Sequence, residues 1–178
     1  MGAAIPSVGR AIGFAQDIAK NGIEKALTNL GLGDLVGQPA ELALGVLTDV
    51  FCPNGGPIDQ AIAREAWDEA VLELTEIEIT DIKDVTADQW QVLVTDFITR
   101  TIETKVINDV GNEGISLPQD VGAINQIQND LHELIKGAVN DGIDGRLNVG
   151  NTIAQSEIQS LVTDIYERSF AYLEALEE

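Results

Sequence analysis

The stretch that decides the fold is residues 86–110, TADQWQVLVTDFITRTIETKVINDV. It opens with Thr86 and Gln89 at the spacing of a capping box, in which each side chain satisfies a free backbone donor at the start of a helix. Apolar residues then recur every three or four positions, as on the buried side of a helix: Trp90, Leu93, Phe97, Ile98, Ile102, Val106 and Val110. We therefore expect one long helix here, ending at the glycine-containing segment 111–114.

Glycine and proline divide the rest of the chain into further helices. Ser7 is the predicted N-cap of the first helix, and Gly22 is a point at which that helix divides in two. Pro39 and Pro57 each suit the first position of a helix, where the missing N–H would be unpaired anyway. The expected helices, about six in number, span roughly residues 7–30, 39–50, 57–74, 86–110, 118–138 and 152–176.

Periodicity also predicts which side of each helix is buried. In the second helix the expected inner residues are Leu42, Val46, Leu47 and Val50. In the third and fifth helices, the expected inner residues are Ile58, Ile62, Ala66, Ala70 and Leu74, and Val121, Ile124, Ile127, Leu131, Leu134, Ile135 and Ala138. Only residues 74–80 alternate as a strand would, and they fit a short strand or the frayed end of a helix equally.

Length and composition fit one all-α domain, a helical bundle spanning residues 7–178 and preceded by a disordered N-terminal segment, residues 1–6. The chain has 178 residues, of which 44% are apolar, the ordinary share for a folded globule. It has no apolar run of the roughly 20 residues needed to cross a bilayer. It also lacks a lysine-rich start followed by an apolar block, so we expect a cytoplasmic protein without membrane contact.

The charge is strongly negative and unevenly distributed. The formal net charge is −20, and 25 of the 30 acidic residues lie in residues 59–178. This charge argues against direct binding to nucleic acid or to an anionic membrane, because both require a positive surface. Three interpretations stay open: a solvated face that maintains solubility, a docking face for a basic partner, or mimicry of nucleic acid.

Catalytic chemistry has few candidates. One cysteine and one histidine exclude an intrachain disulfide and the common cysteine- or histidine-rich metal sites. His132 has no carboxylate three or four residues away to orient it as a base, and Cys52 at a helix end is expected to close the core. Trp67 and Trp90 are expected in the core or half-buried, the alternative being a stacking platform. No cofactor or metal is expected, and the remaining enzymatic alternative is a pocket of buried carboxylates.

Two blocks of the sequence carry a family resemblance. One consists of residues 34–37 and 52–64, the latter reading CPNGGPIDQAIAR; the other consists of residues 108–111, 127–128 and 135–139. Together they resemble the QatB family, the small component of the Qat anti-phage defence system, over roughly residues 25–175.

The resemblance implies an antiviral, non-enzymatic role. The family's neighbours are an ATPase (QatA), a QueC-like enzyme of 7-deazaguanine chemistry (QatC) and a TatD-like nuclease (QatD). QatC is the implied partner, and the protein itself is its implied substrate. The flexible Gly/Pro-rich N-terminal tail expected of the family is reduced here to residues 1–4, so no modification site is carried over.

The shared blocks also supply the candidate partner-contact loops. These residues are Cys52, Asn54, Gly55 and Gly56 in the first block, and Asn108, Asp109, Gly111 and Gly114 at the end of the long helix. The alternative is that they only terminate helices, since glycine permits backbone shapes that other residues resist.

Overall fold

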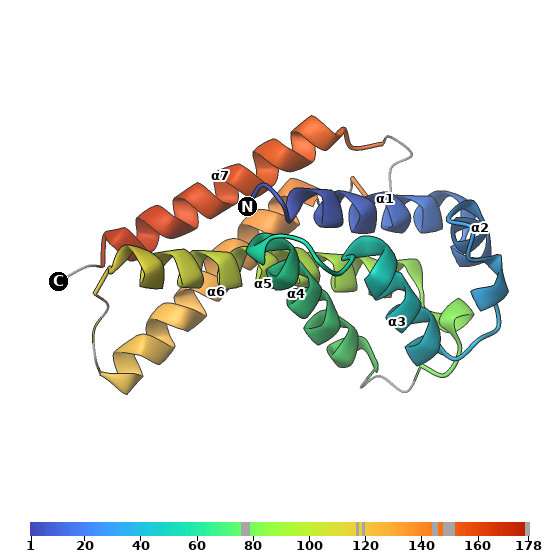
Figure 1. Cartoon of the computed structure of the whole chain (residues 1–178), viewed down its shortest axis with the longest axis horizontal. Helices are drawn as coiled ribbons and strands as arrows, with labels where there is room; N and C mark the ends of the chain where they lie inside the picture. The colour runs from blue at the N-terminus through green and yellow to red at the C-terminus, as the bar shows by residue number, and fades with distance from the viewer. Residues whose placement is uncertain (76–78, 117, 119, 144–145, 148–151, 177–178) are drawn as a thin grey trace.

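The computed structural model describes residues 1–75, 79–116, 118, 120–143, 146–147 and 152–176. Over these ranges the chain forms seven α-helices, two short 3-10 helices and no strand (Figure 1). The elements are α1 (Ile5–Asn21), α2 (Ile23–Asn29), η1 (Gly33–Leu35), α3 (Ala40–Phe51), α4 (Ile58–Thr75), η2 (Ile82–Asp84), α5 (Ala87–Glu113), α6 (Val121–Ile143) and α7 (Gln155–Glu174). The predicted all-α, single-domain bundle is confirmed.

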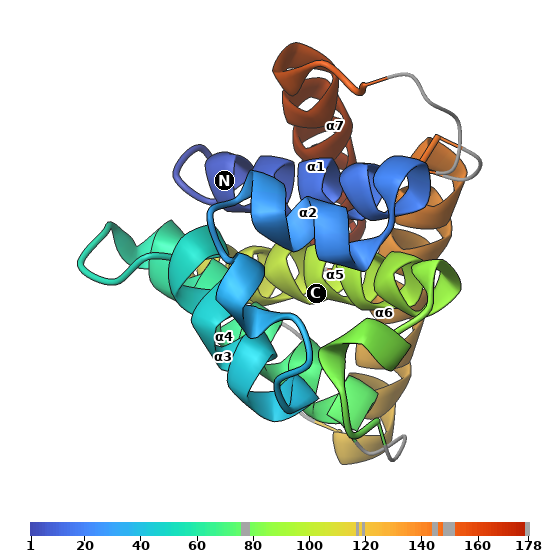
Figure 2. The same cartoon turned by 90° about the vertical axis from the view of Figure 1, so that its right-hand side faces the viewer.

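Helix α5 runs through the centre of the bundle and packs against α1, α4, α6 and α7. Figure 2 shows these helices arranged around it. The predicted capping box is present: the Thr86 Oγ1 accepts from the Gln89 backbone N–H at 3.2 Å, and the Gln89 Oε1 accepts from the Thr86 N–H at 2.8 Å. The helix therefore begins where the sequence predicts.

The burial of α5 depends on packing from several neighbouring helices. Its buried residues extend around most of the helix, and the remaining side carries charged residues that include Asp96, Arg100 and Glu103. Its buried threonines are satisfied within the helix, because the Thr99 and Thr101 hydroxyls donate to the carbonyls of Thr95 and Phe97 at 2.8 and 2.7 Å. The central helix thus carries polar side chains into the core without leaving those hydroxyls unpaired.

A chain of aromatic rings joins four helices in the core. It runs from Trp90 through Phe14, Phe51 and Trp67 to Phe97, with ring centroids 5.2, 5.4, 5.0 and 5.3 Å apart at successive steps. Three of the four pairs are edge-to-face, the arrangement that ring quadrupoles favour. Both tryptophans are fully buried, which confirms their expected place in the core.

The N-terminal helix differs from the prediction at its start. It begins at Ile5, Ala4 and Ile5 are buried, and the predicted N-cap Ser7 lies inside the helix and is also buried. The expected boundary between residues 6 and 7 therefore falls within α1. The predicted break at Gly22 is present, with φ 83°, and it raises the described helices from about six to seven.

The buried faces of three helices, α3, α4 and α6, also differ in part from the prediction. In α3 the buried residues are Ala40, Ala43, Leu44, Leu47, Thr48 and Phe51, whereas Leu42 is 53% exposed. In α6 only the C-terminal half is buried, and its first residue, Val121, is 70% exposed. Figure 1 shows the start of α6 extending away from the other helices. Ile58, expected inside, is 77% exposed.

The segment before α5 is tied back to α3 by an isolated bridge. The Ala40 N–H donates to the Thr80 carbonyl at 3.0 Å, and the Ile82 N–H donates to the Gln38 carbonyl at 3.2 Å. The possible strand at 74–80 includes residues 76–78, which lie outside the described residues. Among the described helices, none combines the length and apolar composition of a bilayer-spanning helix.

Candidate functional site

The corner between α3 and α4 is held by two arginines. Arg10 of α1 donates from its Nε and Nη2 to the Phe51 carbonyl at 3.0 and 2.8 Å. Arg64 of α4 donates from Nη1 to the Cys52 carbonyl at 2.8 Å and pairs through Nη2 with Asp49 at 2.8 Å. Cations at this position also suit the negative end of the α3 dipole. The loop that follows is therefore anchored at its first residue.

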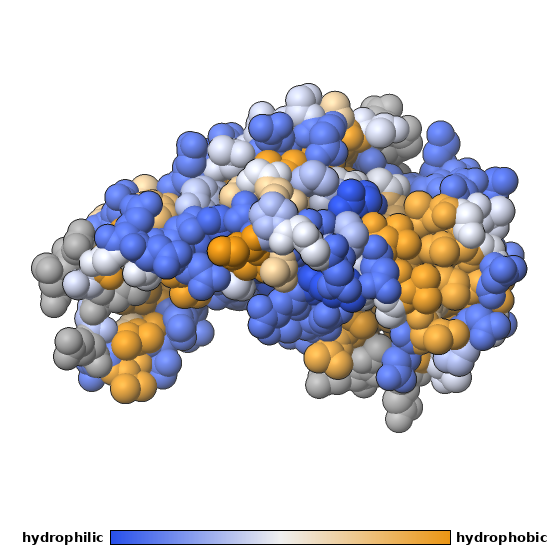
Figure 3. Space-filling view, viewed as in Figure 1, coloured by the Kyte–Doolittle hydropathy of each residue, from blue (hydrophilic) through white to orange (hydrophobic). Residues whose placement is uncertain are grey.

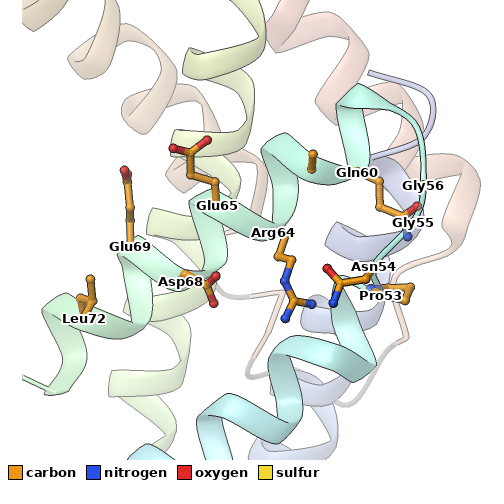
Figure 4. Close-up of a pocket in the computed structure, with 11 residues that line it drawn as sticks. Pro53, Asn54, Gly55, Gly56, Gln60, Arg64, Glu65, Asp68, Glu69 and Leu72 are labelled. Carbon is orange, nitrogen blue, oxygen red and sulfur yellow. The ribbon is translucent and has the colours of Figure 1, made fainter.

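An open recess of about 420 Å³ lies beside this loop. Figure 4 shows Asn54 and Arg64 at one end and Leu72 at the other, with the carboxylates of Glu65 and Glu69 directed away from Arg64. Arg64 is already engaged by Asp49 and the Cys52 carbonyl. The recess is therefore lined by the loop on one side and by acidic residues of α4 on the other.

One of the two glycines of this loop is required by its backbone conformation. Gly55 has φ 89°, a backbone conformation that favours glycine. A Cβ added to Gly56 would lie 1.4 Å from the Gln60 Oε1, so this position has no room for a side chain unless Gln60 moves. At Gly55 and Gly56 the loop presents backbone to the recess, beside the side chains of Pro53 and Asn54.

Cys52 lies beneath the loop and not on its surface. It is 0% exposed, and burial raises the pKa of its thiol from 9.0 to about 11. A buried neutral thiol is a poor nucleophile, because the thiolate is the reactive form. The structure confirms that Cys52 closes the core and leaves it no access to a partner in this conformation.

The second group of candidate residues belongs to a helix, contrary to the expected loop. Asn108, Asp109 and Gly111 all lie within α5, and only Gly114 is at the helix end, where it adopts φ 74°. A single interior glycine destabilises a helix by about 1 kcal/mol, and that is too little to end one held by buried Val106 and Val110. The partner-contact interpretation of these four residues stays a prediction.

Asp109 takes part in a network that links three helices. Its carboxylate accepts from the Lys105 Nζ at 2.5 Å and from the Tyr166 hydroxyl at 2.5 Å, and the same Nζ lies 3.5 Å from Asp59 Oδ1 in the first turn of α4. Partial burial by itself raises the pKa of Asp109, but the Lys105 and Tyr166 bonds outweigh burial and lower the pKa. Burial and the Asp109 carboxylate raise the pKa of Tyr166. The structure thus connects the two sequence blocks through Lys105.

His132 has a carboxylate partner that helix spacing did not predict. Its Nδ1 lies 2.9 Å from the Glu103 Oε2, across the contact between α6 and α5. The expectation that no carboxylate of its own helix orients this histidine holds, and the partner comes instead from α5. The pair is only partly buried, and it is a link between two helices.

Other chemistry is sparse in the part of the chain that the structure describes. No group of three or more His, Cys, Asp or Glu side chains there is placed to hold a metal ion. No Asp or Glu is buried among the described residues, where the buried polar side chains are serines and threonines. These positions weigh against a pocket of buried carboxylates.

Exposed apolar surface is a feature that the periodicity of the sequence did not predict. One patch is the outer side of α3, where Leu42 and Val46 line a shallow depression of about 510 Å³. Another is a recess of about 270 Å³ between α4 and α5, at whose rim Val92 is 67% exposed. A signal was present in α3, whose residues are apolar on both sides, but no sequence rule indicated which side stays open.

The chain is an acidic all-α protein whose distinctive features are an anchored loop, open recesses and exposed apolar surface. Such features are typical of proteins that bind other proteins. The sequence model of the family described as Qat anti-phage system associated protein QatB matches residues 1–173, so the chain belongs to the QatB family. Searches of curated proteins and of solved structures found no match.

Proposed function

We propose that this chain is a non-enzymatic binding component of a Qat anti-phage complex. Its partner in the proposal is the QueC-like protein QatC, and the chain serves as the protein substrate of QatC. The ATPase and the TatD-like nuclease of the same system are the further partners.

The α3–α4 corner carries the proposal. Arg10 holds the carbonyl of Phe51 at the end of α3, Arg64 holds the carbonyl of Cys52 at the start of the loop, and the recess beside the loop is open to solvent. A loop held in one conformation loses little entropy on binding, so it suits recognition by a partner. The described residues place no nucleophile and base together at this corner, which supports binding in preference to catalysis.

The first test is co-purification of the chain with the QueC-like protein at about 0.1 M and about 0.5 M salt, concentrations that differ strongly in screening. A complex at low salt supports the proposal, and its weakening at high salt indicates a contribution from complementary charge. The absence of a complex at both concentrations would remove the proposal.

A matched pair of variants locates the contact. Asn54→Arg places a long cation on the exposed loop, whereas Asn125→Arg makes the same change on the exposed start of α6. We expect the first variant to reduce capture of the partner about tenfold and the second to leave capture unchanged. Equal effects of the two variants would contradict the loop as the contact.

The substrate role has its own measurement. Intact mass of the full-length protein, expressed with and without the QueC-like enzyme, should differ by one added group if the chain is modified. An unchanged mass in the presence of a stable complex would leave a binding component and remove the substrate role. Turnover of a metabolite by the purified chain alone would contradict the non-enzymatic assignment.

A further inference from the structure

The outer side of α3 is an apolar helix face without a covering element among the described residues. Leu42, Gly45 and Val46 lie along it with Asp49 one turn further on, at the spacing of a single helix face. Leu42 is 53% exposed, and the depression that these residues line measures about 510 Å³. Figure 3 shows a broad hydrophobic area on the side of the molecule where α2 and α3 lie in Figure 1.

Gly45 is the informative residue on this face. A Cβ added there would meet nothing within 4 Å, and Gly45 does not adopt positive φ. Glycine is the poorest helix former after proline, so this residue weakens α3 without serving any contact within the chain. A second helix lying across Gly45 would benefit from its missing side chain, because small residues let two helix backbones approach closely.

The charges at the edges of the face indicate what kind of helix would bind. Glu41 is an exposed acid at one end of the depression, whereas Asp49, about two helical turns further on, is already paired with Arg64. A second copy of this chain would place acidic residues against acidic residues, on a protein of net charge −20. Charge complementarity instead favours a helix with lysine or arginine beside its apolar side chains.

We propose that the outer face of α3 is the docking site for an amphipathic helix of a partner protein. The partner's apolar side chains pack on Leu42 and Val46, its backbone approaches closest at Gly45, and a basic side chain pairs with Glu41. This inference rests on the proposed function, since it names the surface by which the chain would bind its partner.

The decisive variant is Gly45→Ala, measured for thermal stability and for affinity to the purified QueC-like protein. Alanine favours the helix and meets open space, so the melting temperature should rise by a few degrees. The same methyl group would hold the docked helix away, so the affinity should fall about tenfold or more. A change that stabilises the free chain and weakens the complex is not expected from a purely structural residue.

Gly13→Ala is the matched control. Gly13 is also an exposed glycine inside a helix, α1, and a Cβ there also meets nothing within 4 Å. This variant should raise the melting temperature in the same way and leave the affinity unchanged. Leu42→Glu should abolish binding, and Glu41→Lys should reduce binding most strongly at low salt.

Each outcome has one meaning. A wild-type chain that binds none of the Qat proteins overturns both this inference and the proposed function. Binding by wild type that Gly45→Ala and Leu42→Glu leave intact overturns only the α3 docking site. A lower melting temperature for Gly45→Ala would place the glycine's role in the fold and overturn the inference. A wild-type dimer in sedimentation that Leu42→Glu dissociates would overturn it in favour of a second copy.

Discussion

Helices α5 and α3 both carry apolar residues on more than one side, yet the other helices cover those sides to different extents. The central helix α5 packs against α1, α4, α6 and α7, so most of its apolar residues are covered, Val92 being an exception. The shorter α3 packs against α1, α4 and η2, and only the side carrying Leu44 and Phe51 reaches the core. The opposite side remains open at Leu42. Apolar residues on several sides of a helix therefore indicate burial only where neighbouring helices can cover each of those sides.

The largest effect should come from the centre of α5. Phe97 is completely buried, and its ring packs edge-to-face against Trp67 with ring centroids 5.3 Å apart. We expect Phe97→Ala to lower the free energy of unfolding by about 3–5 kcal/mol, because it removes buried area and leaves a cavity. Urea denaturation measures this difference. A loss below about 1 kcal/mol would contradict the central place of α5.

The polar network at the end of α5 should have a smaller effect that depends on pH. Asp109→Asn removes the charged partner of Lys105 and is expected to lower the free energy of unfolding by about 1–2 kcal/mol at pH 7. The folded-state pKa of Asp109 is lowered, so its stabilisation is present above the unfolded pKa of about 3.9 and is lost as the pH falls through the folded value.

The stability difference between wild type and Asp109→Asn should therefore shrink as the pH is taken from 7 to about 2. Denaturation curves at several pH values measure it. Asn125→Asp, an acid introduced at an exposed position of α6, is a control for the general effect of charge. A difference independent of pH would mean that the Asp109 charge does not stabilise the fold.

The start of α5 offers the next test. Thr86→Ala removes one half of the capping box and should lower the free energy of unfolding by about 1 kcal/mol. Thr86→Ser keeps the hydroxyl and should be close to wild type. Equal losses for the two variants would show that the cap is not the source of the effect.

The smallest effect is expected on the open side of α3. Leu42→Ser should change the free energy of unfolding by no more than about 0.5 kcal/mol, since the side chain is largely in solvent. Leu44→Ser, two residues away on the buried side, should destabilise the chain by several kcal/mol, about as much as other polar or truncating core substitutions. Comparable losses at both positions would mean that the outer face of α3 is covered within the chain.

Much of the fold could be predicted from the sequence, and the failures share a cause. The capping box at Thr86, the break at Gly22 and the buried tryptophans depend on local chemistry or on bulk, and all are confirmed. The predicted end of α5 within residues 111–114 is also confirmed, because Gly114 caps the helix, although Gly111 itself lies inside it. For the candidate site, the Gly55–Gly56 turn was identified, but the burial of Cys52 beneath it limits which residues can contact a partner.

By itself, the sequence determined that the chain is helical, where most helices begin, and that its surface is acidic, since these properties depend on neighbouring residues and on composition. Only the tertiary structure decided which side of α3 stays open, that Glu103 lies against His132, and that Lys105 links Asp59 with Asp109. These contacts join residues far apart along the chain. Periodicity within one helix contains no information about the helix that packs against it.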